Sequence, residues 1–329
     1  MEDNILLSHG EGGYLTNRLI NDLILKYIGN EFTKNLNDSA CFKVYEKKLC
    51  FTTDSFVVNP IFFPGGNIGS LAVYGTVNDL SVSGAKPLYL SLSFIIEEGF
   101  EIKEFERILK SIKKASEKAK VKIITGDTKV VPKGNCDKIY INTSGIGIYN
   151  YNCEISPMMI EEDDVIIVNK SIGEHGLAVF LARENFQIDA EIFSDSRPLN
   201  IEIEKLKKEI KTIHCMRDAT RGGLATVLKE LAESSNKNFE IFHENIPVKD
   251  EVKGVCEILG FDPLYIANEG VFVIFVKEDE AKNVLKTLKD GKIIGRVLKE
   301  KEGRVFLKTE IGGVREIDMI AESLIPRIC

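Results

Sequence analysis

The sequence predicts an α/β (α+β) protein of two domains, in which pairs of strands alternate with long amphipathic helices. The chain has 329 residues, of which 44% are hydrophobic and 28% are charged. This is an ordinary globular composition with enough chain for two domains. Apolar residues recur at helical spacing in several segments, and short β-rich runs lie between these segments. Both halves of the chain follow this order, which indicates sheets covered by helices.

Composition also excludes several classes of protein. The net charge is −7 and no dense basic stretch occurs, so nucleic acid is not an expected partner. No run of about 18 apolar residues is present, so no membrane span is expected. The first residues are acidic and lack the apolar core of a signal peptide. Seven scattered cysteines without a C-x-x-C pair indicate a reducing compartment, so we expect a cytoplasmic protein.

The first half begins with a glycine-rich segment, Ser8 to Gly13, that leads into a helical pattern. Such a loop presents backbone N–H groups that can bind an anion, although a flexible N-terminal arm is an equal alternative. Strands and helices then alternate up to residue 149. We expect strands at 41–45, 49–53, 87–96, 121–125 and 139–149, and helices at 15–27, 68–84 and 101–120.

A polar stretch at 150–164 marks the expected boundary between the domains. We therefore predict an N-terminal domain at 1–150, a second domain at 151–322 and a mobile tail at 323–329. The apolar pattern of 317–324 is helical, and Pro326 prevents it from continuing. In the second domain we expect strands at 165–168, 271–276, 293–297 and 305–307, and helices at 173–183, 201–213, 224–234, 248–259 and 278–288.

Acidic residues at element ends are the first candidates for a functional site. Asp54 closes one predicted strand and Asp127, with Lys129 beside it, follows another; a turn cap is the alternative reading. Asp79 is in the interior of a helix of small residues that must pack closely. A carboxylate there is costly unless it is paired or bound to a metal.

Further candidates lie in the second half. Capping of the helix at 224–234 explains Asp218 alone, but two flanking arginines, Arg217 and Arg221, together with paired glycines are typical of a phosphate site. Glu269 lies at a loop-to-strand junction, where an exposed surface glutamate is the alternative. His175 at a helix start is more typical of a cap or packing residue than of a ligand or base.

The final residue is a cysteine, Cys329, on a short end that Pro326 separates from the preceding run. Five extended residues span roughly 17 Å, enough to deliver a thiol into a cleft or to a partner. The terminal carboxylate raises the pKa of this thiol by like-charge repulsion, and we expect Arg327 to oppose that shift. A frayed terminus without a role is the alternative.

Taken together, six segments resemble the HypE family of hydrogenase maturation proteins, within the superfamily of aminoimidazole ribonucleotide synthetase and selenophosphate synthetase. The middle segments are shared across the superfamily, whereas the terminal PRIC singles out HypE. Glu11 departs from the small residue expected in the glycine loop. The six segments are SHGEGG, TTDSFVVNPIFFPGGNIGSLAVYGTVNDLSVSGAKP, ITGDTKVV, RDATRGGLATVL, ANEG and PRIC.

The resemblance implies a two-domain aminoimidazole ribonucleotide synthetase-like fold. The N-terminal mixed sheets of two subunits form a barrel in a homodimer, and the C-terminal domain is an α/β sandwich. It also implies an ATP-dependent carbamoyl dehydratase. Under this resemblance, Cys329 would receive a carbamoyl group from a HypF-like carbamoyltransferase, and the enzyme would convert it to S-cyanide. The cyanide would then pass to iron on a HypC–HypD complex and become a ligand of the [NiFe]-hydrogenase centre.

The same resemblance assigns roles to individual residues. The acids would bind Mg²⁺ and ATP, because magnesium takes oxygen ligands and phosphoryl transfer requires charge neutralisation. Lys129 and Glu269 would be catalytic; we prefer Glu269 as the base with Lys129 steadying the developing charge, and a proton relay between them is the other option. The metal ligands are Asp38, Asp54, Asp79 and Asp218, with Asp127 as a fifth candidate. The nucleotide contacts are Gly10, Gly12, Gly13, Asn78, Asp127, Thr128, Arg217 and Arg221.

Two alternatives remain at this point. Beside the dehydratase, one is a non-catalytic carrier or scaffold in metal-centre assembly, and the other is another ATP-dependent synthetase of the superfamily. Selenophosphate synthetases carry a catalytic cysteine or selenocysteine and a lysine in the N-terminal loop, where this chain has His9 and Glu11. We further expect the tail to alternate between an inward position for dehydration and an outward position for loading and delivery.

Overall fold

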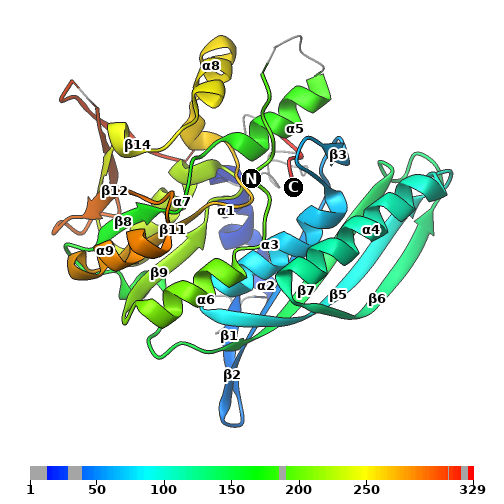
Figure 1. Ribbon diagram of the computed structural model, residues 1–329, viewed down its shortest axis with the longest axis horizontal. Helices are drawn as coiled ribbons and strands as arrows, with labels where there is room; N and C mark the ends of the chain where they lie inside the picture. The colour runs from blue at the N-terminus through cyan, green and yellow to red at the C-terminus, as the bar shows by residue number, and fades with distance from the viewer. Residues whose placement is uncertain (1–12, 29–38, 185–189, 310, 320–324) are drawn as a thin grey trace.

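The computed structural model describes residues 13–28, 39–184, 190–309, 311–319 and 325–329. Two mixed β-sheets, one from each half of the chain, lie on either side of the central helix α3 (Ile68–Val82) (Figure 1). Nearly every residue of α3 is buried, because the helix packs against the first sheet, against α4 and against elements of the second half. Its small residues allow this close approach on all sides.

The first sheet has five strands in the order β1-β2-β7-β5-β6. Helices α3 and α4 (Ile102–Ala119) cover one face of it, and the short hairpin β3–β4 (Phe62–Phe63, Gly66–Asn67) precedes α3. The β5–β6 pair is parallel and the other pairs are antiparallel. The strands are β1 (Ala40–Val44), β2 (Lys47–Phe56), β5 (Ala85–Glu97), β6 (Lys122–Val131) and β7 (Ile139–Tyr149).

The second sheet has seven strands in the order β14-β13-β10-β12-β8-β11-β9. Its central strands are apolar on both faces, since alternate side chains enter two different cores. Helices α6 (Asn200–Glu209) and α9 (Glu278–Thr287) pack on one face, and α7 (Gly223–Ser235) packs on the other. The strands are β8 (Val165–Val168), β9 (Ile213–Asp218), β10 (Phe239–Phe242), β11 (Phe272–Val276), β12 (Lys292–Val297), β13 (Val305–Lys308) and β14 (Val314–Ile317).

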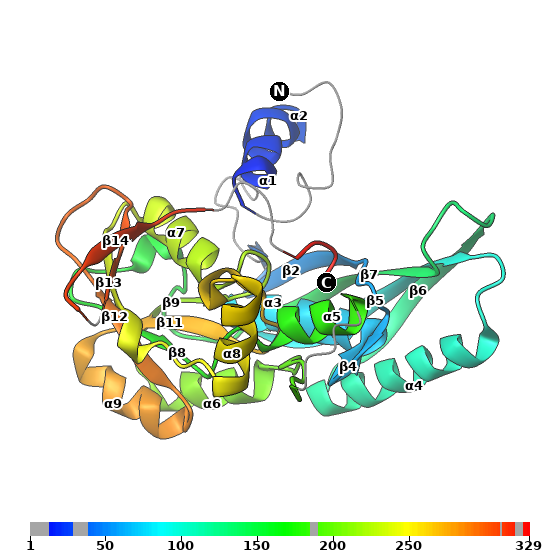
Figure 2. The ribbon, with the colours of Figure 1, turned by 90° about the horizontal axis from the view of Figure 1, so that it is seen from above.

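Two helices of the second half belong to the core of the first. Helices α5 (Glu174–Glu184) and α8 (Asp250–Leu259) pack with side chains of α3, α4 and the first sheet. An N-terminal helix, α1 (Tyr14–Arg18) continued by the π-helical η2 (Leu19–Ile24) and α2 (Leu25–Ile28), stands apart from the body in Figure 2. Single 3₁₀ turns occur at Pro157–Met159, His243–Asn245 and Pro263–Tyr265.

The predicted α/β fold and most of its elements are confirmed, but several bounds were wrong. β6 continues through Val131 instead of ending at residue 125, so Asp127 and Lys129 lie within the strand. The helix predicted at 201–213 ends at Glu209. Residue Ile213 begins strand β9, which was missed because it carries His, Arg and Asp among its apolar residues. Strands β10 and β14 were also missed, and residues 320–324 of the expected last helix lie outside the described residues.

One face of the first sheet is not covered by the described part of the chain. Phe51, Ile146 and Tyr89 are direct cross-strand neighbours on this face, and they are 42%, 39% and 42% exposed. The described sheet is open, with β6 at one edge. The closed dimeric barrel therefore stays a prediction. Among the described helices, none combines the length and the apolar character that crossing a membrane requires.

The start of α7 depends on glycine at two positions. Gly222 and Gly223 have φ angles of 74° and 66°, where other residues are strained. A Cβ atom at Gly223 would lie 2.5 Å from the carbonyl oxygen of Leu264. These glycines are therefore required by the backbone and by the contact between α7 and the segment at Leu264.

We expect Gly223→Ala to lower the free energy of unfolding by about 2 kcal/mol or more, because it adds both strain and a backbone clash. The matched control is Gly254→Ala in α8, where a Cβ would meet nothing within 4 Å. That change should stabilise the protein by about 0.5–1 kcal/mol. Urea unfolding of both variants measures the difference, and equal stabilities would contradict this account of Gly223.

Candidate active site

A cavity of about 750 Å³ opens between the two halves of the molecule. Acidic, cationic and hydroxyl side chains from both halves line it, and the terminal thiol of the chain reaches the same space. Seven of the residues that the sequence predicts for the site line this cavity: Asp54, Asp79, Arg217, Asp218, Arg221, Glu269 and Cys329. Among the other lining residues are Thr16, Asn17, Thr52, Thr53, Gly75, Met158, Thr220 and Glu230.

Two of the acids come from neighbouring elements of the first half. Asp54 lies near the end of β2, and Asp79 lies in the last turn of α3, which packs against that strand. The hydroxyl of Thr52 donates to Asp79 Oδ2 at 2.9 Å, and the backbone N–H of Ser55 donates to Asp54 Oδ1 at 2.8 Å. These bonds hold both carboxylates at the same end of the sheet.

The other two acids meet because β9 and β11 are antiparallel neighbours. Asp218 is the last residue of β9 and pairs with Phe272, the first residue of β11. Glu269 lies three residues before Phe272, so it falls just beyond the same edge of the sheet. Both side chains are buried, with Glu269 only 4% exposed. The sheet register therefore places Asp218 and Glu269 together although 50 residues separate them in sequence.

Burial and like charge dominate the electrostatics of the cavity. The pKa of Glu269 is raised well above the ordinary value, first by burial and then by the charges of Asp218, Asp54 and Asp195. Burial also raises the pKa of Asp54, and the Arg221 guanidinium opposes this shift. Arg221 is the shared counter-charge, and its own pKa is raised first by Cys329 and further by the surrounding carboxylates.

The C-terminal tail is docked inward, and its thiol faces the cavity. Cys329 is half-buried, because the protein encloses it on most sides while the cavity admits water. Burial raises the pKa of this thiol to about 12, and the nearby carboxylates reinforce the shift. Arg221 is the cation that lowers it. The expectation that Arg327 plays this part was wrong, because its guanidinium instead binds Asp137 Oδ2 at 2.8 Å and the carbonyl of Val57 at 3.1 Å.

Asn78 lies behind the cavity wall and is not among the lining residues. It is 1% exposed, and its amide group bonds only to backbone in the described contacts. Its Nδ2 donates to the carbonyls of Arg197 at 3.1 Å and Glu269 at 3.2 Å, and its Oδ1 accepts from Leu199 N at 2.8 Å. In this structure Asn78 ties α3 to the segment that carries Glu269 and does not face the space where a nucleotide would lie.

Asp127, Thr128 and Lys129 are also absent from the cavity lining. All three are exposed on the edge strand β6, and Lys129 Nζ lies 2.6 Å from Asp127 Oδ2. This hydrogen bond lowers the pKa of Asp127. Register pairs Asp127 with Ser93 and Lys129 with Ile95, on the uncovered face of the first sheet. Within one chain, therefore, Lys129 forms an ion pair with Asp127 and does not meet Glu269.

The remaining expectations concern glycines and one acid. Gly10, Gly12 and Asp38 lie outside the described residues. Gly13 is buried and precedes α1, with a φ angle of 82°. The paired glycines Gly222 and Gly223, which suggested a phosphate loop, are explained by the backbone geometry of α7.

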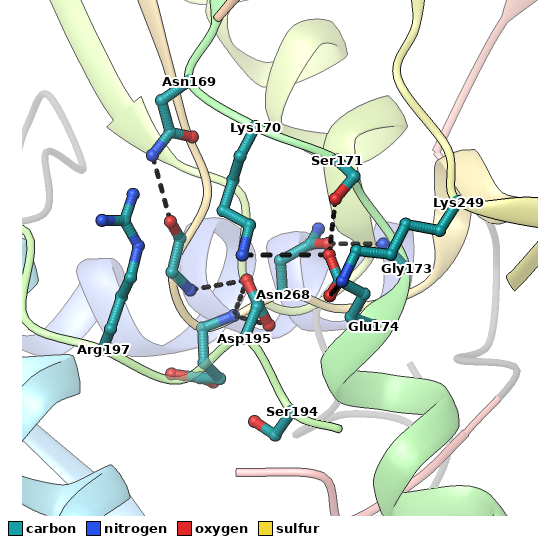
Figure 3. Close-up of polar contacts among 12 residues, drawn as sticks. Asn169, Lys170, Ser171, Gly173, Glu174, Ser194, Asp195, Arg197, Lys249 and Asn268 are labelled. Atoms are coloured by element: carbon teal, nitrogen blue, oxygen red, sulfur yellow. Dashed lines mark hydrogen bonds and ion pairs between the residues drawn. The ribbon is translucent and has the colours of Figure 1, made fainter. Parts of the chain in front are cut away.

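Sequence reasoning missed residues that face or support the cavity. Thr16 and Asn17 reach it from the N-terminal helix, where Asn17 Nδ2 donates to Glu230 Oε1 at 3.2 Å. Asp195 is 6% exposed and accepts hydrogen bonds from the N–H groups of Glu269 and Gly270 (Figure 3). It lies in a segment without secondary structure or a recognisable motif, so no periodicity pointed to it.

The cavity offers oxygen donors of the kind that a divalent cation binds. Among the described residues, no three His, Cys, Asp or Glu side chains converge closely enough to hold a metal alone. Magnesium, however, is usually held by one or two carboxylates together with substrate phosphates and water. Asp54, Asp79 and Asp218 supply hard oxygen donors around one cavity, and this chemistry fits a metal that arrives with a nucleotide.

Comparison with known proteins gives a consistent result. The model of the AIR synthase related protein N-terminal domain matches residues 36–149, and the model of the C-terminal domain matches 161–308. The chain is 42% identical to carbamoyl dehydratase HypE of Bradyrhizobium diazoefficiens, covering 98% of this chain and 95% of that protein. A solved HypE–HypF complex shares 44% identity and a TM-score of 0.87, over 92% and 99% of the two chains. A solved HypE bound to ATP shares 42% identity and a TM-score of 0.83, over 99% and 100%.

The raised pKa of Cys329 predicts a pH-dependent docking of the tail. The thiol of the docked tail has a pKa of about 12, whereas its ordinary pKa is 9.0. Its contribution to docking is therefore fully present below pH 9.0 and is lost as the pH rises from 9.0 toward about 12. We expect the alkylation rate of Cys329, followed by mass of the C-terminal peptide, to keep rising above pH 10 in native protein. In urea-unfolded protein the alkylation rate should level off just above the ordinary thiol pKa of 9.0. The same plateau in native protein would contradict a docked thiol.

Proposed function

The chain belongs to the HypE family of carbamoyl dehydratases, within the AIR synthase related proteins, and we propose that its cavity dehydrates a carbamoyl group carried on Cys329. The reaction belongs to the maturation of [NiFe]-hydrogenase and consumes ATP. The observation that supports this site most directly is that Cys329 shares one cavity with Glu269 and the acids expected to bind the nucleotide.

The chemistry requires a leaving group and a base. The carbamoyl oxygen accepts the γ-phosphoryl group of ATP, which releases ADP and converts that oxygen into a good leaving group. Loss of the two nitrogen protons and departure of phosphate then leave an S-cyano group on Cys329. The net result is removal of one water at the expense of one ATP. The non-catalytic carrier is disfavoured because the tail places the thiol among these catalytic groups.

We assign roles to the cavity residues accordingly. Magnesium, when bound, would neutralise the phosphate charges, and Asp54, Asp79 and Asp218, with Asp38, would hold it. Arg217 and Arg221 would contact the phosphates and, with Gly10, Gly12 and Gly13, position ATP. Glu269 would take a proton from the nitrogen. It must first lose its own proton, and Arg221 is the neighbouring charge that favours this loss.

The position of Lys129 supports a homodimer. Lys129 and Asp127 share the uncovered face of the first sheet with the exposed row of Phe51, Ile146 and Tyr89. A second copy docked there would bury this row and bring Lys129 and Asp127 toward the partner's cavity. We therefore propose that Lys129, Asp127 and Thr128 act across the dimer, and that Asn78 supports Glu269.

The proposed partners follow from the chemistry. A HypF-like carbamoyltransferase would load Cys329, and the solved HypE–HypF complex of a relative supports this pairing. A HypC–HypD complex would receive the cyanide on iron. Loading requires the thiolate, whereas the docked thiol is held protonated. We therefore propose that the tail leaves the cavity for loading and delivery, in the cytoplasm.

We expect carbamoylated protein to lose one water from its C-terminal peptide only when Mg-ATP is added. Loading with a carbamoyltransferase and carbamoyl phosphate, followed by intact mass of that peptide, measures both steps. Glu269→Gln should load normally and lose water at least about a hundredfold more slowly, as expected for a lost general base. The matched control is Glu230→Gln, which changes a carboxylate of the same cavity on the side of α7.

An adduct that forms in wild-type protein but never loses water would support a carrier. If no adduct forms with a competent donor, the tail is not part of the mechanism.

The dimeric site predicts complementation between two inactive variants. Lys129→Ala and Glu269→Gln should each be inactive, because each removes one component from every site. Random mixing after mild dissociation should restore about a quarter of wild-type dehydration, since half the dimers are mixed and each contains one intact site. No recovery in mixtures shown by native mass to contain mixed dimers would place Lys129 in its own chain's site, and full activity of Lys129→Ala alone would place Lys129 outside the mechanism.

A further inference from the structure

The docked tail is held by its backbone. The Arg327 carbonyl accepts from Asn59 N at 3.1 Å and from Arg183 Nη2 at 2.8 Å. The terminal oxygen of Cys329 accepts from Val57 N at 3.0 Å. Between them, the carbonyl of Ile328 lies 2.7 Å from Nε2 of His175. Each of these three tail residues therefore has a fixed backbone position, and His175 fixes the one next to the thiol.

His175 is fully buried at the start of α5. Its ring lies edge-on to Phe63, with centroids 5.4 Å apart. A carbonyl can only accept, so Nε2 must donate to Ile328. Burial lowers the pKa of His175, against the opposing charge of Asp195, and keeps the ring neutral. The second nitrogen, Nδ1, is then an acceptor, and it lies 2.7 Å from the hydroxyl of Ser194.

Ser194 leads directly to the support of Glu269. The Ser194 hydroxyl donates to His175 and accepts from Ser196 N at 3.1 Å. The next residue, Asp195, accepts from Glu269 N at 3.1 Å and from Gly270 N at 2.8 Å. Figure 3 shows Asp195 within the polar contacts at the centre of the view, and Ser194 below it. Ser194 thus supports the tail through His175, and the adjacent Asp195 fixes the backbone of Glu269.

We propose that His175 is a positioning residue which, through its bonds to Ile328 and Ser194, registers the tail thiol against the segment that holds Glu269. The inference rests on the proposed role of Cys329 as carrier of the reacting group. A shift of the tail by one hydrogen bond would move the carbamoyl group carried on Cys329 away from Glu269. The bond to Ile328 lies next to the thiol, whereas the contacts of Arg183 and Asn59 hold the tail two residues away from it.

Four variants test this role. His175→Phe removes the donor and keeps a ring of similar size, and His175→Gln keeps a donor at a similar reach. Ser194→Ala keeps the donor to Ile328 and removes the hydroxyl that bonds to His175 and to Ser196 N. His214→Phe is the control, because His214 is also buried, bonds to Asp164 at 2.7 Å and lies outside the cavity lining. It measures the general effect of losing a buried histidine.

Two readouts are needed. For His175→Phe we expect Cys329 to be alkylated about tenfold faster at neutral pH, as expected for the loss of a buried hydrogen bond. Dehydration of the preloaded carbamoyl group should fall by at least about tenfold in kcat, with the KM for ATP unchanged. The loading rate should rise together with alkylation, because loading uses the same undocked thiolate. His175→Gln should recover part of both effects, and Ser194→Ala should lower kcat with a smaller change in alkylation.

The proposal would be overturned if Cys329 in folded His175→Phe were alkylated at the wild-type rate. It would also be overturned if His175→Phe and His214→Phe changed the alkylation rate and kcat equally. Should His175→Phe fail to fold, Ser194→Ala decides, since unchanged kcat there would overturn the link to Glu269. The alkylation readout requires no carbamoyl chemistry. A wild-type protein that cannot dehydrate would therefore remove the proposed function while leaving the role of His175 in docking measurable.

Discussion

The site depends on one guanidinium, that of Arg221, placed among acidic groups that the fold crowds together. Asp54, Asp79 and Glu269 all act on it, and Cys329 acts on it most strongly. Charges drawn away from water are tolerated only when opposite charge and hydrogen bonds compensate. Here the compensation is incomplete, since the pKa values of Asp54 and Glu269 remain raised. The protein therefore holds a cavity with excess acidic groups, and such a cavity favours a nucleotide that arrives with a divalent cation over the bare anion.

This arrangement needs both halves of the chain, and α3 joins them. One side of the helix packs on the first sheet and presents Asp79 beside Asp54, whereas Asn78 bonds to the backbone of Arg197, Leu199 and Glu269. An asparagine suits this position because its amide satisfies two carbonyls and one N–H at once. Adjacent residues on one helix thus fix a carboxylate of the first half and the backbone of Glu269 in the second. The bonds of Asn78 therefore fix the two halves of the chain relative to each other beside the acidic cavity.

The sequence predicted the fold well where periodicity was strong, as in α4 and β7, and poorly where polar residues are buried. β9 was missed because its histidine, arginine and aspartate interrupt the apolar pattern, although all six of its residues are buried. Motifs pointed to Asp54, Asp79, Asp218 and Arg221, and all four line the cavity, while their roles as metal or nucleotide contacts stay predictions. They could not show which face of β6 carries Lys129, nor that Asp127 would be its partner, because that depends on strand register. His175 was given its common packing interpretation, and only the docked tail shows its bond to Ile328.

The docked tail also orders the proposed cycle. A free thiol ionises as pH rises, and ionisation opposes docking because the cavity is acidic and the thiol pKa is raised to about 12. Carbamoylation removes the ionisable proton, so the loaded tail no longer has this penalty. It also supplies an N–H₂ group, and carboxylates such as Glu269 accept hydrogen bonds from such donors. Conversion to the S-cyano group removes both N–H donors and weakens this attraction. In the proposed cycle, the chemical state of Cys329 would therefore bias the tail inward before the reaction and outward after it, while His175 and Arg183 would offer the docked tail the same backbone bonds throughout.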